Sequence, residues 1–396
     1  MICFLQPIVV LSVAFILRVD LMWQRAKGGK VMIVIADKKD CVGCGACANI
    51  CPKQCITMKE DSEGFAYPNI DKNTCINCCL CERVCPIINP PKYRKVQNVY
   101  ACYNKDEQVR MDSSSGGFFS LLANYVLQKK GYVAGAAFDA NLLVHHILIN
   151  KAEGLPLLRG SKYLQSRMGD IYNSVQGALE TGKPVLFSGT PCQCAGLKNF
   201  LGHEYENLFS VDVVCHGVPS PKVYRKKLND VAEQIGENVV SVKFRDKSTG
   251  WKRCQLIFAG EKIIVKEIKQ ESPYMQAFLR NMSVRPSCSV CHYNNEHSSA
   301  DLTIADYWGV ETKFQELNDD KGVTVVLVNT TKGGSLFEKV RENAKVWESN
   351  FSHASQHNFA MKNVGTLHPA REVFFARLGA EKFDDLVHEL LANSPK

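Results

Sequence analysis

The chain has 396 residues, enough for two or three domains, and its 45% hydrophobic and 22% charged residues are ordinary for a packed globular protein. Its formal net charge is +8, but the basic residues are dispersed, so nothing in the pattern indicates nucleic-acid binding. The 18 cysteines fall in tight CxxC clusters within a large chain, which is typical of metal or cluster ligands and not of a secreted disulfide scaffold. Such thiolates need a reducing compartment, so we expect a cytoplasmic protein.

The first segment, residues 1–32, is set apart by an almost wholly apolar run over its first 17 residues. A membrane span needs roughly 17–25 apolar residues, so the run is at the short limit. It lacks the basic start and the small-residue cleavage site of a signal peptide. Two interpretations remain open: a translation start placed too far upstream, or a weak membrane-associated tail. The sequence from Met32 onward is typical of the start of a ferredoxin domain, which favours the first interpretation, and membrane contact is not expected.

Residues 33–91 are predicted to form a bacterial ferredoxin-like domain, because one cysteine motif occurs there twice in tandem. The motif is Cys-x2-Cys-x2-Cys-x3-Cys-Pro, beginning at Cys41 and again at Cys75. Three thiolates at this spacing bind one 4Fe-4S cluster, and the fourth cysteine of each motif ligates the other cluster. The predicted ligands are Cys41, Cys44, Cys47 and Cys85 for one cluster, and Cys75, Cys78, Cys81 and Cys51 for the second.

The alternative for this region is a pair of structural zinc sites. Zinc sites use paired CxxC motifs and not a triplet followed by Cys-Pro, so two tandem matches favour clusters. Cys55 and Cys79 fall outside the pattern and are predicted to be small, buried thiols beside the clusters. Pro90 and Pro91 then mark a boundary, since proline neither continues a helix nor donates to a sheet.

Beyond that boundary, strand and helix patterns alternate, which predicts an α/β core with a largely parallel or mixed sheet. Strands are predicted at 99–103, 133–139, 144–149, 184–187 and 208–215, and helices at 118–130, 166–180, from 191 onward and at 221–235. Thr190 is predicted to cap the helix that begins at Pro191, and the small residues 113–117 to cap the helix at 118.

The rest of the chain divides less sharply. Residues 239–245 and 253–265 are rich in strand formers, and the last seventy or so residues are expected to be mainly helical. We divide the region into an N-terminal part of the core, a C-terminal part and a helical tail, at residues 96–184, 185–350 and 351–396. The predicted fold class is thus α+β or α/β, with a ferredoxin-like domain followed by an α/β core and a helical C-terminal part.

A second, sparser set of cysteines lies in the core: Cys192, Cys215, Cys288 and Cys291. Cys192 is at a predicted helix start, where the helix dipole lowers the pKa of a thiol, and Cys215 is at the predicted end of a strand. Four thiolates suit a third 4Fe-4S cluster or a tetrahedral zinc ion, and unrelated buried thiols are a third alternative. Cys194 is close enough to Cys192 to compete as the ligand, whereas Cys3, Cys102 and Cys254 look like ordinary cysteines.

Several segments in a fixed order make the chain resemble the coenzyme F420 hydrogenase/dehydrogenase beta-subunit family. They are the two ferredoxin motifs, SSSGGFFSLLANYVL (113–127), GSKYLQS (160–166), PVLFSGTPCQCAGLK (184–198), DVVCHGVPSPKVY (212–224), FRDKSTGWK (244–252) and CSVCHYNNEHSSADLTIADYWG (288–309). The resemblance covers roughly residues 33 to 310. It implies FAD and one 4Fe-4S cluster in the core, which favours a third cluster at the core cysteines over zinc.

The resemblance also implies a flavin near the turn formed by Ser115, Gly116 and Gly117. A small-residue turn at a helix start presents free N–H groups to a diphosphate, although most such turns only begin a helix. Residues Ser161, Lys162 and Tyr163 could supply a cation for the phosphate and a stacking ring.

No catalytic residue is assigned, because packing around the core cysteines explains three polar residues as well as catalysis does: His216, Asp301 and Asp306. The predicted function is that of a flavin-dependent iron–sulfur oxidoreductase, because flavin converts between two-electron and one-electron chemistry. Expected partners are a redox protein or a hydrogenase-type subunit, and a two-electron donor or acceptor such as a deazaflavin, with the direction of electron flow open. The alternatives are a non-catalytic electron-relay subunit and a ferredoxin fused to a zinc-stabilised binding domain.

Overall fold

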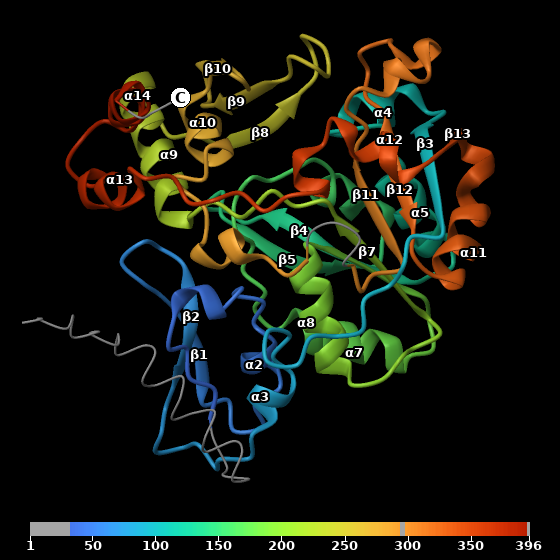
Figure 1. The fold of residues 1–396 in the computed structure, drawn as a ribbon, viewed down its shortest axis with the longest axis horizontal. Coiled ribbons are helices and arrows are strands. Elements are labelled where there is room, and N and C mark those ends of the chain that lie inside the picture. The colour runs from blue at the N-terminus through green and yellow to red at the C-terminus, as the bar shows by residue number, and fades with distance from the viewer. Residues whose placement is uncertain (1–31, 294–297, 394–396) are drawn as a thin grey trace, which may run out of the picture.

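The computed structural model describes residues 32–293 and 298–393, so the predicted apolar extension lies outside the described residues except for its last position. Within these two ranges no helix is both long and apolar enough to cross a bilayer. Figure 1 shows a small cysteine-rich N-terminal part, in blue, lying against a larger core that is built around one sheet.

The N-terminal part contains a β-hairpin, two single-turn α-helices and a short 3-10 helix, Lys38–Asp40. Strands β1 (Ile56–Glu60) and β2 (Ala66–Ile70) pair antiparallel. Helices α2 (Ala46–Asn49) and α3 (Leu80–Arg83) each lie inside one cysteine motif. The residue before each helix adopts a left-handed conformation, with φ of 74° at Gly45 and 62° at Cys79. Glycine adopts this conformation without strain, so the second motif repeats the turn of the first with a less suitable residue.

The core is built on an eight-stranded mixed sheet with the strand order β13-β3-β12-β11-β7-β6-β4-β5. Its strands are β3 (Asn98–Asn104), β4 (Tyr132–Phe138), β5 (Val144–Ile149), β6 (Val185–Gly189), β7 (Leu208–Val213), β11 (Leu302–Asp306), β12 (Thr324–Val328) and β13 (Ala344–Ser349). The adjacent strands β4, β6, β7 and β11 run parallel, and the outer pairs are antiparallel. Strands from both sides of residue 185 therefore share one sheet.

The helices that cover this sheet are α4 (Glu107–Asp112), α5 (Phe118–Gln128), α6 (Leu155–Leu158), α7 (Ile171–Glu180), α8 (Pro191–Leu201) and α11 (Thr331–Val340). One apolar cluster joins Phe118 and Leu122 of α5 to Phe337 of α11 and to the sheet, and a second joins α7 and α8 to the other side. The predicted alternation of strands and helices is confirmed through α8, where Thr190 caps the helix with a complete capping box and Pro191 is its first residue.

A smaller layer lies beside the main sheet. Strands β8 (Ser241–Asp246), β9 (Gln255–Ala259) and β10 (Ile264–Ile268) form a three-stranded antiparallel sheet. Helices α9 (Pro221–Ile235), α10 (Pro273–Leu279), α13 (Arg371–Arg377) and α14 (Phe383–Ala392) pack on it through one apolar cluster. Helix α12 (Phe351–Gln356) precedes α13, so the described part of residues 351–396 is mainly helical, as predicted.

Three local predictions are wrong in detail. The predicted helix 166–180 begins only at Ile171, because Arg167 pairs with His145 in a β-bridge and Gly169 has φ of 51°. The N-cap of the helix at Phe118 lies within the predicted run 113–117, at Gly117 with φ of 82°, but no serine side chain of that run caps the helix. The mainly helical end of the chain also contains a strand that was not predicted, since β13 is an edge strand of the main sheet.

Two of the contacts between the N-terminal part and the core are made at helices α9 and α8. The hairpin turn meets the start of α9, where Lys222 Nζ donates to Ser62 O at 2.8 Å. Helix α2 lies against α8, where a Cβ added to Gly196 would be 3.1 Å from Cys44 Sγ. The ferredoxin-like part is therefore packed directly on the helix that begins beside Cys192.

Candidate redox site

The first predicted ferredoxin group is brought together in a buried position beside the core. Cys44, Cys47 and Cys85 are buried, and Cys41 is half-buried. Burial raises the pKa of Cys44, and the charges of Cys85, Cys47 and Cys41 raise it further. Each of the four thiols thus lies within electrostatic reach of the others, although they come from motifs more than thirty residues apart in the chain.

The second predicted group lines a small cavity at the far end of the N-terminal part. The cysteines that line it are Cys51, Cys55, Cys75, Cys78, Cys79 and Cys81. Cys78 is exposed, which makes this group the more accessible one. Cys55 is buried, as predicted, with its Sγ 3.3 Å from Cys51 Sγ. The prediction that Cys79 is buried is wrong: it is half-buried at the left-handed position before α3.

The four core cysteines also converge, although they come from separate segments of the chain. Burial raises the pKa of Cys215, and the neighbouring charges of Cys288, Cys192 and Cys291 raise it further. Cys192 is the first cysteine of α8 and its Sγ is 3.2 Å from Thr190 Oγ1. Cys215 lies two residues beyond β7, and Cys288 is in a short 3-10 helix, Pro286–Val290.

The expected effect of the helix dipole on Cys192 is overridden. Burial raises the pKa of Cys192 to about 12, and the charges of Cys291 and Cys288 act in the same direction. The competing thiol, Cys194, is buried on the other side of the helix and donates to Val211 O at 3.8 Å. Burial and the charge of Asp212 raise its pKa. Cys194 therefore packs against the sheet.

Two buried tyrosines lie between the first ferredoxin group and the core group. Tyr172 is within electrostatic reach of Cys44 and Cys192, and its hydroxyl donates to Gln193 O at 2.9 Å. Tyr293 is within reach of the same two thiols, and its hydroxyl donates to Pro86 O at 2.9 Å. Cys47 in turn is near Cys81 of the second group. The three groups thus form a series from the exposed end of the N-terminal part to the core.

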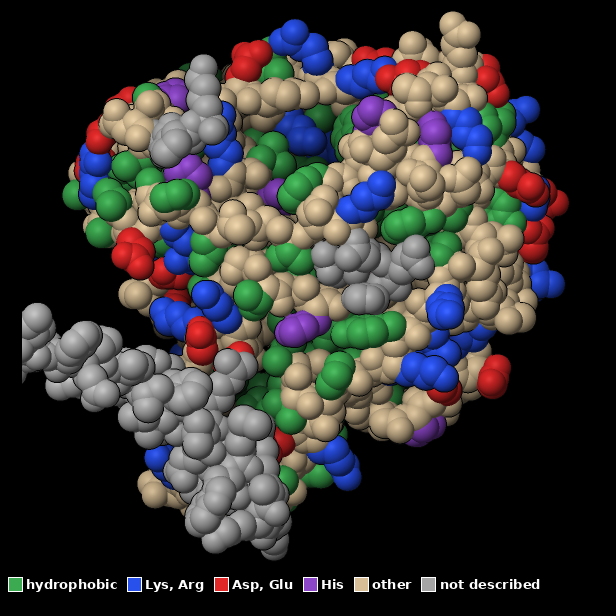
Figure 2. Space-filling model, in the orientation of Figure 1, with side chains coloured by type: hydrophobic (Ala, Val, Ile, Leu, Met, Phe, Trp, Pro, Cys, Tyr) green, Lys and Arg blue, Asp and Glu red, His purple; other side chains and the backbone are tan. Residues whose placement is uncertain are grey.

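The series ends at a large cavity in the core, with a volume of about 510 Å³. Cys215, His216 and Gly217 form part of its wall, so the core cysteine group borders it directly. Figure 2 shows a hollow in this face of the molecule, with basic side chains inside it, between the β8–β10 layer and the segment around α12. Both regions contribute to the cavity wall, through Lys269 and Phe278 on one side and His357 and Phe359 on the other.

Five of the six residues predicted for flavin binding line this cavity: Ser115, Gly117, Ser161, Lys162 and Tyr163. Burial lowers the pKa of Lys162 to about 8, and its ammonium donates to Arg159 O and Gly160 O at 3.1 and 3.2 Å. Gly116 is the exception. Its N–H donates to Thr324 Oγ1 at 2.9 Å, and a Cβ there would be 2.6 Å from Cys102 O.

The three polar residues to which the sequence assigned no catalytic role differ in whether they line the cavity. Asp306 and His216 line the cavity, and Asp306 accepts from Trp251 Nε1 at 2.9 Å. Asp301 does not line it and accepts from Ser210 N and Oγ, each at 2.9 Å, which is a structural role.

Sequence reasoning missed three notable residues of the site: Trp308 and His146 in the cavity wall, and Arg285 between the cysteine groups. His146 and Arg285 lie outside the quoted motifs, and Trp308, although it lies within the segment 288–309, is neither a cysteine nor a glycine of a motif, so no pattern of spacing indicated these residues.

The donor sets fit the groups that the sequence predicts. Cysteine thiolates are the usual protein ligands of iron–sulfur clusters. Bound iron would also offset the repulsion between neighbouring thiolates, which raises the pKa of these buried thiols. Within residues 32–293 and 298–393, no three His, Cys, Asp or Glu side chains meet closely enough to hold a single metal ion. The cavity offers a cation in Lys162 and a turn of small residues in Ser115 and Gly117, which suit a dinucleotide phosphate.

Comparison with known proteins agrees with the cysteine pattern. Residues 182–354 match the family model for the C terminus of the coenzyme F420 hydrogenase/dehydrogenase beta subunit, and residues 40–87 match a 4Fe-4S dicluster domain. A similar solved structure is that of the F420-reducing NiFe hydrogenase complex from Methanosarcina barkeri in a xenon derivative. It is 15% identical, with a TM-score of 0.45 over 76% of this chain and 93% of that chain. No curated protein matches the sequence. Two parts of the chain are therefore similar to a 4Fe-4S dicluster domain and to the C-terminal domain of coenzyme F420 hydrogenase/dehydrogenase beta subunits, which confirms the family resemblance of its motifs.

Proposed function

We propose that the chain is an iron–sulfur flavoprotein oxidoreductase that couples two-electron chemistry in the core cavity to one-electron transfer through its cysteine groups. Iron–sulfur clusters supply single-electron transfer, and FAD supplies the conversion between electron pairs and single electrons. The observation that carries the proposal is the placement of Cys215, which belongs to the core cysteine group and also forms part of the cavity wall.

The residues of the chain divide the work by position. Cys41, Cys44, Cys47 and Cys85 would hold one cluster, Cys51, Cys75, Cys78 and Cys81 the second, and Cys192, Cys215, Cys288 and Cys291 the third. Lys162 would pair with a phosphate of FAD, because a partly desolvated ammonium interacts strongly with an anion. Ser115 and Gly117 would present the backbone to the diphosphate, and the buried walls would exclude water from the reaction.

The proposal includes partners and a location. A one-electron protein partner, such as a hydrogenase-type subunit, would exchange electrons at the exposed end near Cys78. A two-electron carrier such as a deazaflavin would enter the cavity. Thiolate-bound clusters need a reducing environment, which supports a cytoplasmic location.

Metal and flavin content test the proposal on protein purified and reconstituted without oxygen. Three clusters require on the order of twelve irons per chain, whereas two clusters plus a zinc ion give about eight irons and one zinc. We expect about twelve irons, one FAD and no stoichiometric zinc. Eight irons with one zinc would instead support a ferredoxin fused to a zinc-stabilised domain.

The second measurement identifies the two-electron partner. Reduced deazaflavin, NADH and NADPH are added separately, and bleaching of the flavin absorbance is followed. Bleaching with one donor supports an oxidoreductase and names the class of its partner. Full iron content without bound flavin, and without reaction with any donor, would favour a non-catalytic relay subunit.

A further inference from the structure

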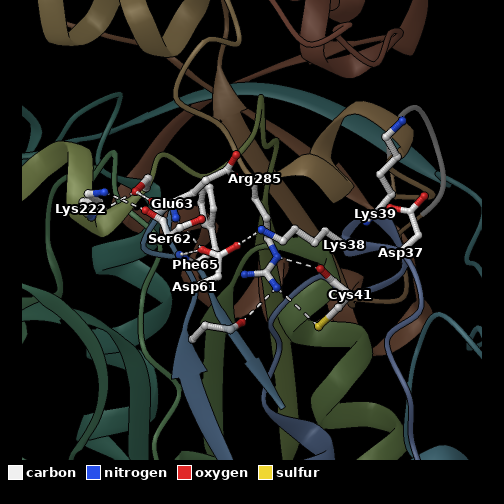
Figure 3. A network of polar contacts seen from close by, with 12 residues as sticks. Asp37, Lys38, Lys39, Cys41, Asp61, Ser62, Glu63, Phe65, Lys222 and Arg285 are labelled. Carbon is white, nitrogen blue, oxygen red and sulfur yellow. Dashed lines mark hydrogen bonds and ion pairs between the residues drawn. The ribbon is translucent and has the colours of Figure 1, made fainter. Parts of the chain in front are cut away.

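One arginine connects the core to the first ferredoxin group and is used by neither cysteine motif. Arg285 is fully buried, with 0% of its surface exposed. Its Nε donates to Cys41 O at 2.7 Å and its Nη2 approaches Cys41 Sγ at 3.5 Å. Nη2 also donates to Ala66 O at 3.0 Å, so the guanidinium holds both the first cysteine motif and the hairpin. Figure 3 shows Arg285 directed from the core into this network, with its guanidinium beside Cys41.

The same residue touches the core group and the cavity segment. Its carbonyl oxygen accepts from Cys288 N at 2.9 Å, and its Nη1 donates to Gln165 Oε1 at 3.1 Å. Gln165 follows Lys162 and Tyr163 in the segment that lines the cavity. The guanidinium also lies 4.2 Å from the centre of the Tyr67 ring, which holds its plane in place.

The buried positive charge of Arg285 requires a nearby anion to offset the cost of its burial. Among the residues that the structure describes, none of the groups that accept from Arg285 is a carboxylate: they are two backbone carbonyls, an amide oxygen and a sulfur. A buried, unpaired guanidinium is costly, so proteins pair such a charge with an anion. Cys41 as a thiolate ligand of a cluster would supply that negative charge.

We propose that Arg285 is a positioning residue that fixes Cys41 against the core and raises the reduction potential of the cluster bound by Cys41, Cys44, Cys47 and Cys85. The inference rests on the proposed function, because it takes Cys41 as a cluster ligand. Reduction adds one negative charge to the cluster, and a nearby buried cation and its hydrogen bond to sulfur favour the more negative state. The arginine thus makes the cluster beside the core easier to reduce.

The test compares Arg285→Met with Arg371→Met in the full reconstituted chain. Arg371 is a matched control, because it is also a buried arginine that links the core to the hairpin. It pairs with Glu63 through two contacts of 2.7 Å and donates to Val284 O. Its removal loosens the same interface without removing a charge from beside Cys41.

Reduction potentials are measured by a redox titration followed by electron paramagnetic resonance. The signal of the cluster in question is the one lost in Cys47→Ala. In Arg285→Met we expect its potential to fall, so that the ratio of reduced to oxidised cluster at a fixed potential drops about tenfold, or about 59 mV for one electron. The potential in Arg371→Met stays at the wild-type value. An unchanged potential in Arg285→Met, or an equal fall in both variants, would overturn the proposal.

Arg285→Lys completes the test if Arg285→Met does not retain its iron. Lysine keeps the charge but cannot form the planar fork of contacts, so a smaller fall in potential is expected. If Arg285→Lys has the wild-type potential, the contacts of the guanidinium are not required to set the potential of this cluster. A failure of the proposed function can be told apart from these outcomes. It would appear as missing iron or a missing cluster signal in the wild-type protein itself.

Discussion

Two cysteines on helix α8, Cys192 and Cys194, have different surroundings although only one residue separates them. Residues two apart on a helix do not face each other. Cys192 shares electrostatic contacts with Cys288 and Cys291, whereas Cys194 is 3% exposed and donates to Val211 O. Geometry thus favours Cys192 as the core ligand, a choice that spacing alone left open.

We therefore expect Cys192→Ala to lose about four of roughly twelve irons, and Cys194→Ala to keep the wild-type content. Removing the buried sulfur of Cys194 leaves only a small cavity, at a cost of about 1 kcal/mol. Iron analysis and the visible spectrum of the two reconstituted variants check the expectation. The assignment fails if Cys194→Ala is the variant that loses iron.

His146 makes the stability of the molecule sensitive to acid. Its ring nitrogens are 2.7 Å from Ser166 Oγ and 3.1 Å from Ser188 O. Burial lowers its pKa from an ordinary 6.5 to about 4. Between these two values the unfolded chain binds a proton that the folded chain does not bind, so acid favours unfolding. The contribution of the neutral His146 ring to the free energy of unfolding is fully present above about pH 6.5, and it is lost as the pH falls towards 4.

The expected loss is about 2 kcal/mol of unfolding free energy between about pH 7.5 and about pH 5. His146→Gln cannot gain this proton, so its urea midpoint should change less over the same interval. His388→Gln, on the exposed face of α14, serves as the control and should keep the wild-type pH dependence. If His146→Gln and the wild type lose stability equally, the ring is not the source of the acid sensitivity.

At the scale of elements, contact between α2 and α8 decides how the ferredoxin-like part meets the core. Gly196 lies at this contact. A Cβ there would be 2.9 Å from Tyr172 Oη and 3.1 Å from both Cβ and Sγ of Cys44. The glycine is therefore required by close packing in the middle of a helix, where alanine would otherwise be preferred.

Gly196→Ala is expected to destabilise the protein by about 1–3 kcal/mol, because overpacking outweighs the gain in helix propensity. Gly177→Ala on α7 is the control, since nothing lies within 4 Å of its added Cβ. That variant should be stabilised by about 1 kcal/mol. Thermal unfolding of both variants checks the opposite signs, and a stabilised Gly196→Ala would show that the two helices separate readily.

Local chemistry explains which elements could be predicted. The capping box at Thr190 and the proline at the start of α9 act within one turn, so both helix starts follow from the sequence. The start of α7 depends instead on a β-bridge between Arg167 and His145, which is a tertiary contact. Strand β13 likewise finds its partner β3 about 240 residues earlier in the chain, and no local pattern indicates that pairing.

For the whole molecule, the arrangement of the cysteine groups gives the chain an outer and an inner end. One group has an exposed member, Cys78, the group around Cys44 lies against α8, and the core group borders the cavity at Cys215. Under the proposed function, an external one-electron partner would act at the outer end and a two-electron substrate at the inner end.

Replacing Cys78 with alanine should separate the two activities. Flavin bleaching by the two-electron donor is expected to persist, because the cavity is unchanged. Reduction of a one-electron protein acceptor should fall at least tenfold, together with the loss of about four irons. Rapid-mixing spectroscopy measures both rates in one sample. Equal rates of acceptor reduction in the variant and the wild type would show that electrons leave by another route.

The sequence by itself determined the 4Fe-4S character of the ferredoxin-like part, because cluster motifs depend on spacing within a dozen residues. The tandem motifs beginning at Cys41 and Cys75 identify the ferredoxin-like part without any structure. Only the tertiary structure decided how the parts connect. It brings Cys192, Cys215 and Cys288 together, sets five of the six predicted flavin residues around one cavity, and places the buried Arg285 against Cys41. These contacts join segments up to about 240 residues apart, and such pairings are fixed by packing and charge burial across the whole fold, which no local pattern records.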